Sequence, residues 1–204
     1  KGVGIVNGLD PAAWDSSQPL SIDNETIEYI YDSNPETDKS KPPKIFKGKE
    51  FPIYGFKEGK AKNKAFLQKY FSVPMENKFG TLKIDPNAFL IVTVSRPDYT
   101  QKGIDILMKS ADKILSDPNM NVQIVITGNG YVEPGKEYSQ EIKDFIKLTE
   151  KYPGKLVLHS IRANAHQAFA AADAVTLPSR FEPCGLTQLQ GMRMGAIPIV
   201  SNTG

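Results

Sequence analysis

The chain has 204 residues, 40% of them hydrophobic, which is enough for one domain with a sizeable core and an appendage. Its 25 basic and 23 acidic residues nearly cancel, so the net charge of +2 gives no reason to expect nucleic acid or an acidic membrane surface as a partner. The single cysteine excludes an internal disulfide and fits a reducing compartment. The two histidines form no metal-ligand cluster, and no apolar run approaches the roughly 18 residues of a membrane span. We therefore expect no metal and no membrane partner.

The first sixty residues carry few signals of regular structure. Residues 1–18 contain a glycine-rich stretch with the turn pair Asn7-Gly8 and lack the pattern of a signal peptide. Residues 19–62 lose hydrophobic periodicity, are interrupted by prolines and are locally basic. We predict that 19–62 is an irregular basic surface excursion. A contact to a polyanion or to a protein partner is the alternative interpretation of its lysines.

From residue 63 onward, predicted helices and strands alternate. Short apolar runs predict strands over 89–94, 122–127, 156–158, 174–177 and 197–200. Apolar periodicity predicts helices over 63–70, 104–115, 137–151 and 164–171, with a further helix from about Cys184. This alternation predicts that residues 63–204 form an α/β domain, a Rossmann-like parallel sheet with helices on both faces and right-handed crossovers.

The turn after the 174–177 strand is the most informative stretch of the sequence. It ends in Glu182, and Pro183 stands just before the predicted helix, where the backbone needs no donor. The free N–H groups and the dipole of a helix start form an anion site, most simply for a diphosphate, so Cys184, Gly185, Leu186 and Thr187 are candidate diphosphate-binding residues. Glu182 would then lie beside whatever the diphosphate carries, and its acceptor oxygens suit sugar hydroxyls. The alternative is that Glu182 is only a solvated turn residue.

Two other turns follow predicted strands at the same sheet edge. Arg96 and Lys102 follow the 89–94 strand, and two cations on one turn can clamp a diphosphate and balance its charge as it leaves. Gly128 and Gly130 follow the 122–127 strand, where glycine permits close backbone approach to a ligand. The alternatives are that Arg96 and Lys102 are only solvated loop cations, and that Gly128 and Gly130 only form an ordinary turn.

Residues 179–189, Ser-Arg-Phe-Glu-Pro-Cys-Gly-Leu-Thr-Gln-Leu, resemble the signature of the bacterial glycogen synthases and plant starch synthases. Gln101-Lys102-Gly103 and the segment around Asn7 are similar to other segments of that family. The resemblance implies the C-terminal, donor-binding half of a retaining GT-B glycosyltransferase, with residues 1–18 as the interdomain crossover and Asn7 near the donor. An Asn that only fixes a turn is the alternative there. We expect the chain to be truncated at both ends and preceded by a second Rossmann domain.

The resemblance also implies a reaction. Glucose would pass, with retention, from a nucleoside diphosphate glucose to the non-reducing end of an α-1,4-glucan, with ADP-glucose favoured over UDP-glucose and no cofactor required. Glu182, Arg96 and Lys102 would be the catalytic residues, and the isolated chain would be inactive. The protein would act in the cytoplasm or, alternatively, in the plastid stroma. Ser160 stands where many members of the family carry Tyr or Phe, which leaves the choice of base open. Another retaining GT-B glycosyltransferase and an inactive nucleotide-sugar-binding regulatory domain are the alternatives.

Overall fold

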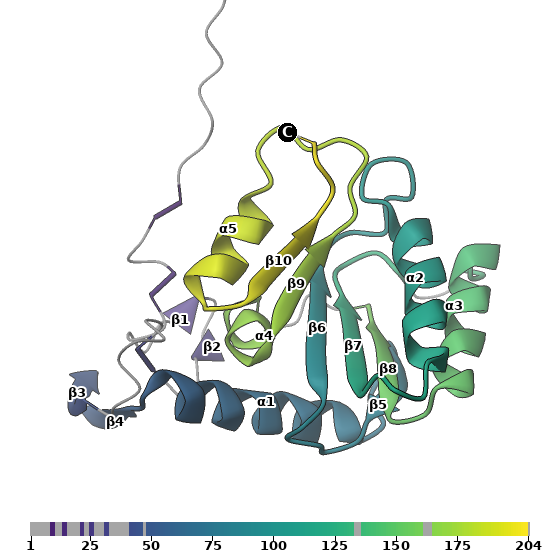
Figure 1. Ribbon diagram of the computed structural model, residues 1–204. Coiled ribbons are helices and arrows are strands. Elements are labelled where there is room, and N and C mark those ends of the chain that lie inside the picture. Colours follow the sequence, from purple (N-terminus) through teal and green to yellow (C-terminus); the bar gives the residue numbers. More distant parts are fainter. Residues whose placement is uncertain are drawn as a thin grey trace, which may run out of the picture.

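A six-stranded sheet forms the centre of the fold (Figure 1). The computed structural model describes residues 9–10, 14–15, 21–22, 25–26, 31–32, 41–46, 48–132, 136–160 and 165–203. The strands are β5 (Lys78–Leu82), β6 (Phe89–Val94), β7 (Val122–Thr127), β8 (Lys155–His159), β9 (Ala174–Leu177) and β10 (Ile197–Val200). Their order across the sheet is β10-β9-β6-β7-β8-β5, and β6 to β10 are parallel, as the sequence predicts.

The edge strand β5 is the one departure from a parallel sheet. It pairs antiparallel with β8, from Lys78 opposite His159 to Leu82 opposite Lys155. The sequence pattern does not indicate this strand, because a lysine and a glycine interrupt its apolar residues. Gly80 has a φ of +76°, and a Cβ there would lie 2.1 Å from the Leu156 carbonyl oxygen, so the glycine is what allows the two strands to meet.

Helices cover both faces of the sheet, as predicted. They are α1 (Phe56–Ser72), α2 (Ile104–Ser116), α3 (Gln140–Lys151), α4 (Ala165–Ala171) and α5 (Leu186–Arg193). Successive residues of β6 point to opposite faces, so Leu90 and Val92 join the core with α1 and α4. Ile91 joins the second core with α2 and α3. In Figure 1, α1 runs across the amino ends of the strands, and α2 and α3 stand together on one side.

Helix α1 begins earlier than the sequence indicates. The helix predicted over 63–70 starts at Phe56, within the segment predicted to be irregular. The first turns of α1 bury Gly59 and Lys60, neither of which is an apolar residue that periodicity would detect. A Cβ at Gly59 would lie 2.2 Å from the Cβ of Tyr31, so the glycine allows Tyr31 to pack against the helix.

Other short elements lie before α1. A two-stranded antiparallel sheet is formed by β3 (Lys41–Phe46) and β4 (Lys49–Ile53), and another by β1 (Ser21–Ile22) and β2 (Glu25–Thr26). The segment 19–62 is therefore not irregular throughout. Within the described ranges, the helices are all too short or too polar to cross a membrane.

Candidate functional site

The candidate site lies where the strand order of the sheet reverses. From β6 the chain adds β7 and β8 on one side and then returns to add β9 and β10 on the other. The loops that follow β6 and β9 therefore leave the same edge of the sheet in opposite directions. This switch point is where open α/β sheets bind their ligands. The β6–α2 loop carries Arg96 and Lys102, and the β9–α5 loop carries Glu182.

Lys102 and Glu182 meet across this switch point. The Lys102 ammonium forms an ion pair with the Glu182 carboxylate, and the Ser179 hydroxyl donates a hydrogen bond of 2.8 Å to the same oxygen. The two charged side chains are only 20% and 11% exposed, so solvent screens this pair less than it screens a surface pair. Two of the three residues predicted to be catalytic are thus brought into direct contact, from positions 80 residues apart in the chain.

Close backbone contacts hold the two loops together. Gly103 has a φ of +64°, and a Cβ there would lie 2.0 Å from the Pro178 carbonyl oxygen. The Arg180 N–H donates to the Gln101 carbonyl oxygen at 2.8 Å. These contacts fix the loop that carries Lys102 against the loop that carries Glu182.

Arg180 adds a side-chain contact that the sequence pattern does not indicate. Its guanidinium donates to both Asp105 carboxylate oxygens, at 2.8 and 2.7 Å, and to the Tyr99 carbonyl oxygen at 2.6 Å. The hydrogen bond from Arg180 lowers the pKa of the Asp105 carboxyl. Arg180 lies within the motif at residues 179–189, but its partners lie in another loop and on α2, so no local pattern reveals the pairing.

Helix α5 begins beside Glu182. Its first residues are Leu186 and Thr187, two positions later than predicted, and Gly185 is the N-cap with a φ of +65° and no capping side-chain hydrogen bond. The first N–H groups of an α-helix have no acceptor within the helix. Such N–H groups and the helix dipole are the basis on which an anion site is predicted from Cys184 onward, and that role stays a prediction.

The other predicted residues are not part of the Lys102–Glu182 contact. The Arg96 side chain is 64% exposed; its guanidinium contacts the Gln101 side-chain oxygen and lies 3.6 Å from an Asp98 carboxylate oxygen. Gly128 and Gly130 follow β7, one strand further along the same edge. Asn7 lies outside the described residues.

The two glycines serve different local needs. A Cβ at Gly128 would lie 1.8 Å from the Ser95 carbonyl oxygen, so only glycine fits between the loops after β6 and β7. Gly130 has a φ of +94° and lines a cavity of about 260 Å³ together with Pro97 and Tyr99. The buried Ser160 connects the loop after β8 to this region, because its hydroxyl accepts from the Val132 N–H at 2.6 Å.

Known proteins resemble both the sequence and the fold. The chain is 36% identical over 203 residues to a glycogen synthase of Glaesserella parasuis and 34% identical over 205 residues to one of Methylocella silvestris. These alignments cover 98% and 99% of the chain but 33% of each relative, so the chain spans about a third of their length. The catalytic domain of Starch Synthase IV from Arabidopsis thaliana, solved with ADP and acarbose, matches 99% of the chain and 33% of its own, with a TM-score of 0.62 and 24% identity.

This structural match confirms the predicted fold, an α/β sheet flanked by helices of the GT-B glycosyltransferase type. Among the residues with described positions, no group of three or more His, Cys, Asp or Glu side chains is placed to hold a metal ion. The family model described as Glycosyl transferases group 1 matches residues 88–204, which is more than half of the chain and includes every loop of the candidate site. The chain therefore belongs to the glycosyl transferases group 1 family.

Proposed function

We propose that the chain binds the nucleotide-sugar donor of a glucan synthase. In the whole protein, glucose would pass from ADP-glucose to the non-reducing end of an α-1,4-glucan, with retention of the anomeric configuration. The observation that carries the proposal is the Lys102–Glu182 ion pair, which lies at the switch point of the sheet next to the uncapped start of α5. Cation, carboxylate and free amides together match the parts of a diphosphate-linked sugar.

Each part of the site has one role in this proposal. The amides of Gly185, Leu186 and Thr187 hold the diphosphate. Lys102 leaves Glu182 to contact a phosphate oxygen and then balances the charge that develops on the departing diphosphate. Glu182, released from Lys102, accepts hydrogen bonds from the sugar hydroxyls and stabilises positive charge at the anomeric carbon.

Arg96 would be the second cation on the diphosphate. Its exposed guanidinium is held by contacts within its own loop, to Gln101 and Asp98, so it can turn toward a donor without breaking a contact to the core. This makes the contribution of Arg96 dependent on a side-chain movement, whereas Lys102 is already at the site.

The nucleoside would lie toward β7. Gly128 and Gly130 permit close approach there, and the cavity beside Gly130 is also lined by Tyr99 and Tyr131. The ADP bound to Starch Synthase IV supports the preference for ADP-glucose over UDP-glucose, and the relatives, which are named glycogen synthases, support a glucan as the product. In this proposal the remaining two thirds of such a protein supply the acceptor surface and the other donor contacts.

Calorimetric titration of the chain with ADP, UDP, ADP-glucose and UDP-glucose tests the donor half of the proposal. We expect binding of ADP and weaker binding of UDP. ADP binding should weaken in Lys102→Ala but not in Lys62→Ala, a lysine of α1 away from the site. A glucan-elongation assay with the full-length protein and with the chain alone tests the rest. We expect elongation only by the full-length protein. A chain that binds no nucleotide would contradict the proposal, and elongation by the chain alone would show that the acceptor site is not elsewhere.

A further inference from the structure

A buried lysine holds the end of α5 that lies away from the candidate donor site. Lys60 of α1 is 7% exposed, and its ammonium donates to the Met194 carbonyl oxygen at 3.3 Å. Met194 is the C-cap of α5, whereas Gly185, its N-cap, belongs to the predicted anion site. The last carbonyl groups of an α-helix have no donor within the helix and carry the negative end of its dipole, so a cation suits this position. Lys60 and the predicted anion site therefore lie at opposite ends of one short helix.

The same ammonium also holds the segment that leads into β9. It donates to the carbonyl oxygen of Phe169, in the last turn of α4, at 3.3 Å, and to that of Ala172, just after α4. Ala172 and Met194 stand before and after the strand–loop–helix unit that carries Glu182 and α5. An ammonium has three N–H donors, and three carbonyl oxygens accept from this one. Lys60 therefore fixes both ends of this unit to α1.

Close packing connects the carboxyl end of α5 to its amino end. A Cβ at Gly191 would lie 2.5 Å from Cγ2 of Val175, so the backbone of α5 lies directly against β9. A Cβ at Gly195 would lie 2.5 Å from Cε2 of Phe56, so the turn after α5 lies equally close to α1. Because tightly packed elements transmit strain, a shift at the carboxyl end of α5 is passed on to the amides at its amino end.

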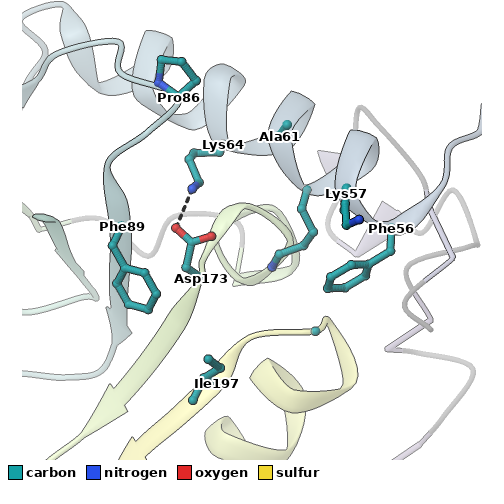
Figure 2. A pocket seen from close by; sticks show the side chains of 10 residues that line it. Phe56, Lys57, Ala61, Lys64, Pro86, Phe89, Asp173 and Ile197 are labelled. Carbon is teal, nitrogen blue, oxygen red and sulfur yellow. Dashed lines mark ion pairs between the residues drawn. The ribbon is translucent and has the colours of Figure 1, made fainter. Parts of the chain in front are cut away.

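The charge of Lys60 can change near neutral pH. Lys60 lines a cavity of about 510 Å³ together with Lys57, Lys64 and Asp173, and Figure 2 shows the ion pair of Lys64 with Asp173 at 2.5 Å as a dashed line. Burial lowers the pKa of Lys60 to about 7; Asp173 acts against this change and Lys64 adds to it. Tyr31, whose hydroxyl donates to the Met194 carbonyl oxygen at 2.7 Å, stays protonated because burial raises its pKa. A neutral Lys60 has only two donors for three carbonyl oxygens, so one of them loses its partner.

We propose that Lys60 is a positioning residue of the donor site. Its charged form holds α5 against β9 and α1 so that the amides at the start of α5 meet the diphosphate, and its neutral form loosens this hold and weakens donor binding. The inference rests on the proposed function, because it takes ADP as the ligand of these amides, and it adds control by pH from the far end of the helix. Since coupling between two binding events is reciprocal, bound ADP must in turn favour the charged form of Lys60.

An NMR pH titration of the Lys60 side chain, with and without saturating ADP, tests the reciprocal effect without any substitution. If the charged form binds ADP about fivefold more tightly, the lower end of usual coupling factors, ADP should raise the pKa of Lys60 by about 0.7. The rise should persist at high salt, which would screen a direct field of ADP across the helix. Lys62, in an ion pair with Glu58 on the same helix, should titrate identically with and without ADP. An unchanged Lys60 titration with ADP bound would refute the proposal, and so would a rise that salt abolishes.

Calorimetric titrations with ADP at pH values on either side of the pKa of about 7 test the effect on binding. From about pH 6 to about pH 9, the ADP affinity of the unaltered chain divided by that of Lys60→Met should fall about four- to fivefold. This ratio cancels the ionisation of ADP and of the other side chains. The same ratio taken with Lys62→Met should stay constant. A constant ratio for Lys60→Met in a chain that binds ADP would overturn this inference alone, whereas no ADP binding at any pH would contradict the proposed function.

Discussion

Replacing Glu182 by glutamine should tighten the binding of ADP to the chain. In the structure, Glu182 holds the ammonium of Lys102, which the proposed function assigns to the diphosphate. Glu182→Gln keeps the size of the side chain and an acceptor oxygen but removes the negative charge. The phosphate then no longer competes with the Glu182 carboxylate for the ammonium of Lys102.

The exposure of the pair sets the magnitude. With side chains 20% and 11% exposed, the pair should be worth the upper end of the range for surface pairs, about 1 kcal/mol. ADP should therefore bind about fivefold more tightly to Glu182→Gln. Lys102→Ala should act in the opposite direction and weaken ADP binding by about 1.5–3 kcal/mol, the contribution of a hydrogen bond to a charged group. The double variant should resemble Lys102→Ala alone, because Glu182 acts on ADP through Lys102.

Calorimetric titration with ADP measures all three variants, and adenosine is the control ligand that should change far less. If Glu182→Gln weakened ADP binding as much as Lys102→Ala, the carboxylate would be a direct contact of the nucleotide and the reasoning would be wrong. In the full-length protein, Glu182→Gln should lower kcat by about 10²–10³, the effect of losing one preorganised electrostatic group. Near-normal turnover would show that the charge of Glu182 is not required.

Three further predictions concern the two loops of the candidate site and Lys60, a buried lysine of α1. Gly103→Ala should lower the free energy of unfolding by about 1–3 kcal/mol in urea denaturation, because its Cβ would clash with the Pro178 carbonyl oxygen at a positive φ; unchanged stability would show that the two loops separate readily. Arg180→Ala should weaken ADP binding about two- to fivefold in the same titrations, and Arg180→Lys should not restore it, because lysine lacks the fork that grips Asp105. Full recovery of ADP binding in Arg180→Lys would show that only the positive charge of Arg180 matters. Lys60 should make the free energy of unfolding rise between pH 7 and 10, because the unfolded state, with a pKa near 10.5, binds the proton that the folded state has released. Lys60→Met should flatten that rise by on the order of 2–3 kcal/mol in urea denaturation at the two pH values, and parallel profiles would contradict the assignment.

The parts of the fold that the sequence predicts are those with an uninterrupted apolar pattern. Strands β6 and β7 are continuous runs of six residues, and their bounds agree with prediction. The start of α1 and the strand β5 were missed, because each depends on residues that look unfavourable in isolation: Gly59 and Lys60 in the helix, Gly80 in the strand. The two glycines are needed because of neighbours that are distant in sequence: Tyr31 packs against Gly59, and the carbonyl of Leu156 lies against Gly80.

The candidate site, like the fold, could be predicted only in part. Sequence alone places Lys102 and Glu182 after two parallel strands, and hence at one edge of the sheet. It does not say that β6 and β9 are neighbours, and that adjacency is what brings the two side chains into contact. The fork between Arg180 and Asp105 depends on the same adjacency. The roles of Arg96, Gly128 and Gly130 in donor binding stay predictions.

The antiparallel edge strand has a consequence for the order of events during folding. β5 precedes the other five strands of the sheet in the chain, yet its partner β8 is the fourth of the six to be made. On a ribosome, β5 would emerge early and would lack its hydrogen-bonding partner strand until β6, β7 and β8 had been synthesised. Closing so long a loop is entropically costly and is repaid only when the central strands already stand side by side. β5 leaves the exit tunnel before the other strands of the sheet, but we expect it to be among the last to form its strand hydrogen bonds. In a nascent chain stalled after β7, β5 should therefore be unpaired.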